Sequence, residues 1–180
     1  MRFMNLNSCL LLVSALAVSA CQHTVNDCDQ LPYDSTVGNA GCLIIKQDKL
    51  LMVQQRINGL WALPGGTAEQ GERAACTAQR ETREETGLDV AVGDKLITLE
   101  NGFHLYRCHA LHDQLAEALD RVEITGWEWL NREQRSQLPW RFAEQHGLID
   151  GLVQEQQALD LQQAEAAGPV IEQTNPAMVP

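Results

Sequence analysis

The segment over 66–88 constrains the fold more than any other part of the chain, because it joins a glycine-rich loop to a charged helix. Three turn-forming residues end a short apolar run just before it: Pro64, Gly65 and Gly66. The residues that follow predict a helix over 72–86, ended by Gly87 in the left-handed conformation and by an apolar contact from Leu88. A loop that leads into a capped helix is therefore the central unit of the predicted fold.

The predicted helix has two different faces. One stripe carries small residues at the spacing of a buried face that lies close to a sheet: Ala75, Ala78 and Thr82. The other stripe carries three carboxylates within about one turn, on an outward and accessible face: Glu81, Glu84 and Glu85. Like charges so placed repel each other, and a hard divalent cation requires such a cluster of oxygen ligands. A solvated acidic helix is the alternative, but it leaves the glycine loop and the distant Glu72 unexplained.

The spacing of these residues resembles the Nudix box, Gly-x5-Glu-x7-Arg-Glu-U-x-Glu-Glu-x-Gly-U, in which U is an apolar residue. Every fixed position has its match: Gly66, Glu72, Arg80, Glu81, Glu84, Glu85 and Gly87. The one departure is Thr82 at an apolar position, where its methyl group can pack and its hydroxyl can bond back to the helix. The lead-in over 60–66 and the strand order over about 39–155 are also similar to this family.

The resemblance implies an α/β (α+β) fold, a Nudix-type α/β/α sandwich with a mixed central sheet. It also implies hydrolysis of a nucleoside diphosphate linked to another group X, with Mg²⁺ or Mn²⁺ as the cofactor. The implied metal ligands are three carboxylates and one backbone carbonyl: Glu81, Glu84, Glu85 and Gly66. Glu81 is either a ligand or the base that takes the proton of the attacking water. Arg80 would pair with Glu72 to hold the loop against the helix.

Nudix enzymes often use a further acid from outside the box, and Glu123 is our candidate, with a solvated strand-end glutamate as the alternative. A different class of function is a Nudix-like module that binds a phosphorylated ligand without cleaving it. Such a module would tolerate loss of the box carboxylates, so the intact cluster counts against it.

Composition limits the partners. The 180 residues suit one domain with short additions, and a hydrophobic content of 44% is enough for a core. The net charge of −11 argues against a nucleic acid polymer as partner, because such binding draws on Lys and Arg. The expected partner is a small-molecule diphosphate whose charge is neutralised by metal ions, and a homodimer is left open.

The N-terminus resembles an export signal. A charge-free apolar run over 9–20 follows Arg2 and is shorter than the about 20 apolar residues that a membrane-spanning helix needs. The run ends in a sequence similar to the lipobox of bacterial lipoproteins, after which Cys21 would be the lipidated first residue. Gln22 then favours the outer membrane, facing the periplasm. An ordinary secretory signal, or a buried helix in a cytoplasmic protein, is the alternative.

The predicted organisation has four parts: a signal peptide over 1–20, a tether over 21–38, the domain over 39–166 and a mobile tail over 167–180. The predicted elements of the domain are a hairpin of 40–45 and 50–54, strands at 89–92, 96–100, 104–110 and 127–130, and a helix over 142–165.

Secretion would place four cysteines in an oxidising compartment, where three pairings exist: Cys28, Cys42, Cys76 and Cys108. We favour unpaired cysteines, with Cys42 and Cys108 as small apolar strand residues and Cys76 in the helix. Three aromatic residues are likewise assigned to the core rather than to base stacking: Trp61, Phe103 and Tyr106.

Overall fold

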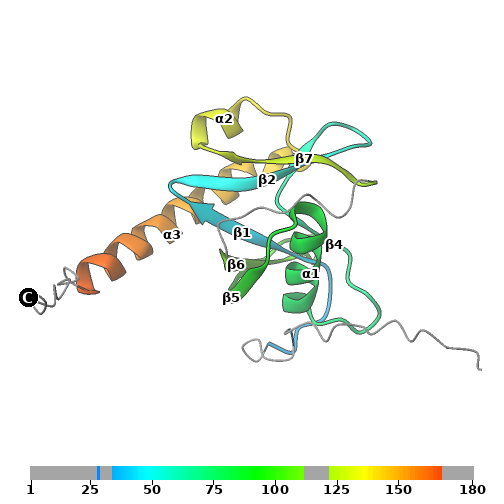
Figure 1. The fold of residues 1–180 in the computed structure, drawn as a ribbon, viewed down its shortest axis with the longest axis horizontal. Coiled ribbons are helices and arrows are strands. Elements are labelled where there is room, and N and C mark those ends of the chain that lie inside the picture. The colour runs from blue at the N-terminus through cyan, green and yellow to red at the C-terminus, as the bar shows by residue number, and fades with distance from the viewer. Residues whose placement is uncertain (1–27, 29–33, 112–121, 168–180) are drawn as a thin grey trace, which may run out of the picture.

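The computed structural model describes Cys28, residues 34–111 and residues 122–167, which form a mixed sheet with helices on both faces (Figure 1). The strands are β1 Ala40–Lys46, β2 Lys49–Gln55, β3 Trp61–Ala62, β4 Gly65–Gly66, β5 Val90–Thr98, β6 His104–Ala110 and β7 Ile124–Leu130. The helices are α1 Ala74–Thr86, α2 Arg132–Ser136 and α3 His146–Ala167, and a 3₁₀ turn, η2, spans Ala143–Gln145.

Strand β1 is the centre of the sheet. It pairs parallel with β6 and antiparallel with both β2 and β4, and β2 also pairs with β3 and β7. The predicted hairpin of β1 and β2 is confirmed. Its turn residues Gln47 and Asp48 both have positive φ, 48° and 62°, which matches the type of two-residue turn that suits the twist of a hairpin.

The alternation of side chains along β1 separates two cores. Cys42 and Ile44 belong to the cluster that packs under α1, whereas Leu43 belongs to the cluster on the other face with Ile149 and Val153 of α3. The small stripe of α1 is buried as predicted: Ala75, Ala78 and Thr82. The molecule is therefore an α/β/α sandwich, which confirms the predicted fold class. The C-terminal part of α3 extends away from the sheet (Figure 1).

Some boundaries differ from the prediction. The strands expected at 89–92 and 96–100 are one strand, β5, whose register against β6 shifts after Val92 and again after Lys95. Such irregularities absorb a residue without ending the strand, so the break in the sequence pattern does not end β5. Helix α1 begins at Ala74, because the preceding Arg73 is extended and bridges to Val37.

The C-terminal part of the domain, from β7 to α3, also departs from the prediction. Strand β7 begins at Ile124 rather than at 127, and helix α2, with a capping box between Asn131 and Gln134, was not predicted. Helix α3 begins at His146 rather than at 142.

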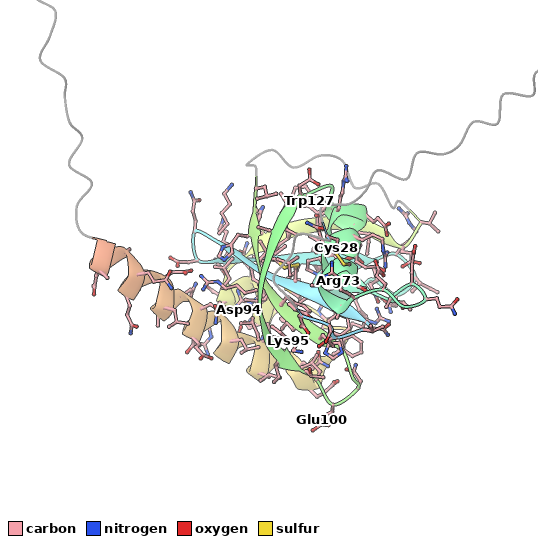
Figure 2. All side chains as sticks on the ribbon, turned by 90° about the horizontal axis from the view of Figure 1, so that it is seen from below. Cys28, Arg73, Asp94, Lys95, Glu100 and Trp127 are labelled. Atoms are coloured by element: carbon pink, nitrogen blue, oxygen red, sulfur yellow. A yellow bond between two sulfur atoms is a disulfide. The ribbon has the colours of Figure 1, made fainter. Side chains whose placement is uncertain are left out.

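The prediction of unpaired cysteines is wrong. Cys28 and Cys76 form a disulfide that fastens the N-terminal segment to α1, and Figure 2 shows Cys28 beside this helix, close to Arg73. Cys42 and Cys108 form a second disulfide, between the neighbouring strands β1 and β6. The sequence placed Cys42 and Cys108 in strands correctly, but it could not show that these strands are neighbours.

Several predictions lie outside the described residues, among them the signal peptide, the lipidation site Cys21 and the tail after Ala167. The last residues of the predicted tether are described and already contact the domain. Ala74 N–H donates to the carbonyl of Thr36 over 2.8 Å, and Tyr106 donates its hydroxyl proton to Asp34 over 2.6 Å. None of the helices in the described ranges is long and apolar enough to cross a membrane.

Candidate active site

The glycine loop lies tightly on the central strand. Strand β4 pairs Gly65 with Gly41 and Gly66 with Ala40 of β1. A Cβ built on Gly65 would lie 2.4 Å from the Cα of Gly41, so neither glycine leaves room for a side chain. The loop is also tied to α1, because Gly65 N–H donates to Glu85 Oε2 over 2.8 Å. The loop and the acidic helix are thus held in one fixed arrangement.

Arg80 forms hydrogen bonds with several residues of the box. Its Nε and Nη2 donate to both oxygens of Glu72 over 2.9 and 2.8 Å, which is the predicted pairing in bidentate form. Nη1 donates to Glu81 over 2.9 Å and to Glu84 over 3.0 Å, and Nη2 also donates to the carbonyl of Thr67 over 3.0 Å. Arg80 therefore connects the loop to two of the three clustered carboxylates.

Glu72 anchors the start of the helix. Besides Arg80, it accepts hydrogen bonds from Glu69 N–H over 2.9 Å and from the Thr77 hydroxyl over 3.0 Å. Burial by itself would raise the pKa of Glu72, but these bonds outweigh it and lower the pKa below its usual value. The Glu72 carboxylate is therefore held in its charged form.

The three carboxylates are not equally accessible, which corrects the prediction of a common outward face. The Glu84 side chain is 44% exposed, that of Glu81 only 15%, and Glu85 is buried against the loop. Glu81 and Glu85 are one turn apart and both point toward the glycine loop, whereas Glu84 is rotated toward solvent.

Glu81 fills the space in front of Gly66. Burial, with help from the negative charges of Glu84 and Glu123, raises the pKa of Glu81 despite the opposing contact with Arg80. Glu123 therefore lies close enough to act on the box electrostatically. Its backbone carbonyl accepts a hydrogen bond from the N–H of Arg56, just before β7.

The donor set fits a hard divalent cation in its chemistry, because the box offers carboxylate oxygens and a loop carbonyl. Within the described ranges, no three His, Cys, Asp or Glu side chains are already gathered as a metal site. Two of the three box carboxylates, those of Glu81 and Glu84, contact the guanidinium of Arg80.

A pocket of about 240 Å³ opens beside Gly65, Gly66 and Glu85. Its apolar lining includes four aromatic side chains from three segments of the chain: Trp61, Phe103, Trp140 and Phe142. Amide side chains share the wall: Asn39, Gln55, Asn101 and Gln145. The assignment of aromatic residues to the core holds for Tyr106, which is buried under α1, but Trp61 and Phe103 also line this pocket.

Sequence reasoning missed Trp140, Arg141 and Phe142, which line the same pocket as the glycine loop and Glu85. Three aromatic or basic residues in succession, directly before the terminal helix, were the available signal. Nothing local in the sequence shows that this segment lies beside β3.

Comparison with known proteins gives the family. The NUDIX domain model matches residues 36–150, which is more than half of the chain. The chain belongs to the Nudix family. Nudix hydrolases act on diphosphate-containing substrates and generally use divalent metal cations, and the relatives of this chain place it in the same enzyme class.

Individual relatives support this placement. The chain is 29% identical over 126 residues to a MutT-like protein of Streptomyces ambofaciens, covering 65% of this chain and 77% of that protein. It is 43% identical over 47 residues to the uncharacterized Nudix hydrolase YvcI of Bacillus subtilis, covering 26% of this chain but only 30% of that relative. The crystal structure of an ADP-ribose pyrophosphatase from Streptococcus suis shares the fold, with a TM-score of 0.53 and 24% identity over 63% of this chain and 90% of that one.

Proposed function

We propose that this Nudix hydrolase uses Mg²⁺, or Mn²⁺ in its place, to cleave a diphosphate linkage in a nucleoside diphosphate linked to X or in a related compound. The observation that carries the proposal is that the glycine loop and Glu85, one of the box carboxylates, directly line the pocket. A substrate whose X group enters the pocket would place its diphosphate beside the box.

Each box residue has a distinct part in this proposal. Glu81, Glu84 and Glu85 would hold the cation together with the carbonyl of Gly66, and the bound cation would neutralise the diphosphate and acidify a water molecule. Glu85 also fixes the loop through Gly65 N–H. Arg80 keeps Glu81 and Glu84 in place, because its guanidinium donates to both.

The reaction adds water across one P–O–P bridge. The water oxygen bonds to one phosphorus, the bond from that phosphorus to the bridging oxygen breaks, and the bridging oxygen leaves with the electron pair. The proton of the water passes to a carboxylate. Glu81 is one candidate acceptor, since it is largely buried beside the loop, and Glu123 is a second acid whose charge acts on Glu81.

One observation favours a second function, a module that binds a phosphorylated ligand without cleaving it. Arg80 Nη1 lies within 3.0 Å of both Glu81 and Glu84, so two of the carboxylates already have a cationic partner in the protein. A cation would have to compete with this contact.

A panel of diphosphate compounds, assayed for phosphate-containing products with Mg²⁺ or Mn²⁺, separates the two functions. We expect turnover by the wild type and a loss of several orders of magnitude in kcat for Glu85→Gln. The amide of this variant keeps an oxygen that can accept the Gly65 N–H bond, so the loop stays in place. Binding without turnover by the wild type would support the module, and metal-dependent turnover retained in Glu85→Gln would overturn the assignment of this ligand.

We also propose that the protein is exported and attached to the cell envelope by lipid on Cys21, with the outer membrane favoured and a cytoplasmic location as the alternative. The apolar run over 9–20 supports export, and so do the two disulfides, because cytosolic proteins rarely keep structural disulfides. Cys21→Ser should abolish labelling by radioactive palmitate and release the protein from membranes. Labelling that persists in this variant would exclude the anchor.

A homodimer is also left open for this protein, and light scattering on the purified protein would measure its oligomeric state.

A further inference from the structure

The segment before α3 is fixed against the strand that leads into the glycine loop. Trp61 N–H donates to the carbonyl of Pro139 over 2.9 Å, and Arg141 N–H donates to the carbonyl of Trp61 over 2.8 Å. Trp61 and Trp140 form a parallel bridge, and the Trp140 indole N–H donates to the carbonyl of Arg135 over 2.9 Å. The backbone of Arg141 is therefore held in place beside β3, and Arg141 lines the pocket that Glu85 also lines.

Arg141 differs from the other arginine of the site, because it has no carboxylate partner among the residues that the structure describes. Arg80 is held by three carboxylates, which leaves little of its charge for a ligand. Among the described residues that line the pocket, Arg141 and Glu85 are the only charged ones, and Arg141 forms no ion pair with the described part of the chain. Its guanidinium carbon lies 5.0 Å from the centre of the Phe142 ring, a contact that restrains the side chain without neutralising it.

We infer that Arg141 is a specificity-determining residue, which binds an ionised phosphate oxygen on the pocket side of the substrate diphosphate. The inference rests on the proposed function. A guanidinium offers a planar fork of N–H donors that matches the oxygens of a phosphate, and its charge persists at every physiological pH. Arg141 lines the same pocket as Gly66 and Glu85, so an anion that extends from the box into this pocket has one cationic side chain among the described lining residues.

A single available cation also limits the substrate class. A diphosphate that carries one uncharged group at each end has two ionised phosphates, one for the box and one for Arg141. A nucleoside triphosphate or a dinucleoside polyphosphate carries further negative charges, for which the described lining of the pocket offers no second cationic side chain. The site therefore selects disubstituted diphosphates whose X group has a flat or apolar part.

The experiment measures binding separately from turnover. The non-hydrolysable α,β-methylene analogues of ADP-ribose and UDP-glucose serve as disubstituted probes, and β,γ-methylene-ATP serves as the triphosphate. Each is titrated by calorimetry with Mg²⁺ into the full chain, as wild type, Arg141→Ala and Arg141→Lys. Arg132→Ala is the matched control, because Arg132 is an exposed arginine on α2 that pairs with Asp150 and does not line the pocket.

For the disubstituted probe that binds best, we expect Arg141→Ala to raise Kd by at least about tenfold, as loss of a charge-assisted hydrogen bond would. Arg141→Lys should recover part of the affinity, and Arg132→Ala should match the wild type. In turnover assays, Arg141→Ala should raise KM while kcat stays within about threefold.

The outcomes separate this inference from the proposed function. An unchanged Kd in Arg141→Ala, or binding of no probe by the wild type, overturns the role of Arg141. Tighter binding of the triphosphate than of both disubstituted probes overturns the substrate class. Binding that depends on Arg141 without turnover of any diphosphate compound supports the inference and refutes the hydrolase function.

Discussion

The carboxylate of Glu81 lies directly in front of Gly66, so that a Cβ built on Gly66 would be 2.5 Å from Glu81 Oε2. Gly66 does not have a positive φ, so the requirement for glycine here is one of space rather than of backbone conformation. The first and fourth fixed positions of the box thus depend on each other physically.

Replacing Gly66 with alanine should therefore displace Glu81 while the fold persists. We expect kcat to fall by about 100-fold, because an error of about 1 Å at a reacting group has a cost of this size. Steady-state kinetics and circular dichroism would measure the two effects. Gly126→Ala in β7 is the control, since its added Cβ meets nothing within 4 Å. Wild-type kcat in Gly66→Ala would show that the position of Glu81 does not matter.

Replacing Thr82 with valine should stabilise the folded protein. The residue is fully buried, and its hydroxyl has no hydrogen-bond partner in the described part of the structure, contrary to the predicted bond back to the helix. Valine keeps the shape and removes a buried polar group, so the free energy of unfolding should rise by about 1 kcal/mol. Urea denaturation would measure it.

Thr86→Val is the matched control for this prediction. The hydroxyl of Thr86 donates to the carbonyl of Thr82 over 2.6 Å and accepts from Leu88 N–H over 3.1 Å. Its loss should lower the free energy of unfolding by about 1 to 2 kcal/mol. Changes of the same sign in the two variants would contradict this account.

The stability of the protein should depend on pH through Asp34, which lies in the N-terminal segment. Hydrogen bonds from the hydroxyls of Thr36 and Tyr106, with the Thr36 N–H and Lys95, hold the pKa of Asp34 well below its usual value. A carboxyl group whose pKa is depressed in the folded protein stabilises the fold at pH values above its pKa in the unfolded chain. This stability is lost as the pH falls through its pKa in the folded protein. Asp34→Asn should therefore be less stable than the wild type at pH 7, and the difference should shrink below about pH 4.

Thermal denaturation of both proteins over pH 2 to 7 would check this. Tyr106→Phe removes one of the donors to Asp34 and should show a smaller difference with the same pH dependence. A difference between the wild type and Asp34→Asn that stays constant down to pH 2 would contradict a role for the Asp34 charge.

The two disulfides should differ in their resistance to reduction. Cys42 and Cys108 are both buried in the core, whereas Cys76 is only half-buried and its partner Cys28 belongs to the N-terminal segment. Mild reductant should therefore open Cys28–Cys76 first, as peptide mapping after alkylation would show.

The double variant Cys42→Ala, Cys108→Ala should lose about 3 kcal/mol of stability, in line with removal of a disulfide that closes a long loop. Alkylation of all four cysteines in unreduced, denatured protein would refute both disulfides.

Those parts of the site that depend on local spacing could be predicted from the sequence. The stripe of Ala75 and Ala78 follows from helical periodicity, and the end of the helix follows from the left-handed conformation that Gly87 allows. The pairing of Arg80 with Glu72 was implied by the resemblance to the Nudix box. The different accessibilities of Glu84 and Glu85 did not follow, because they depend on where the glycine loop lies against β1.

The sequence by itself determined the loop, the capped helix and its acidic face, since hydrogen bonds and periodicity over a few residues specify them. Only the tertiary structure decided which distant segments share the site. The pairing of β1 with β6 brings Cys42 to Cys108, and the bridge from Trp61 to Trp140 brings Arg141 to the pocket. Such contacts depend on strand pairing and core packing over the whole chain, and no local pattern in the sequence encodes them.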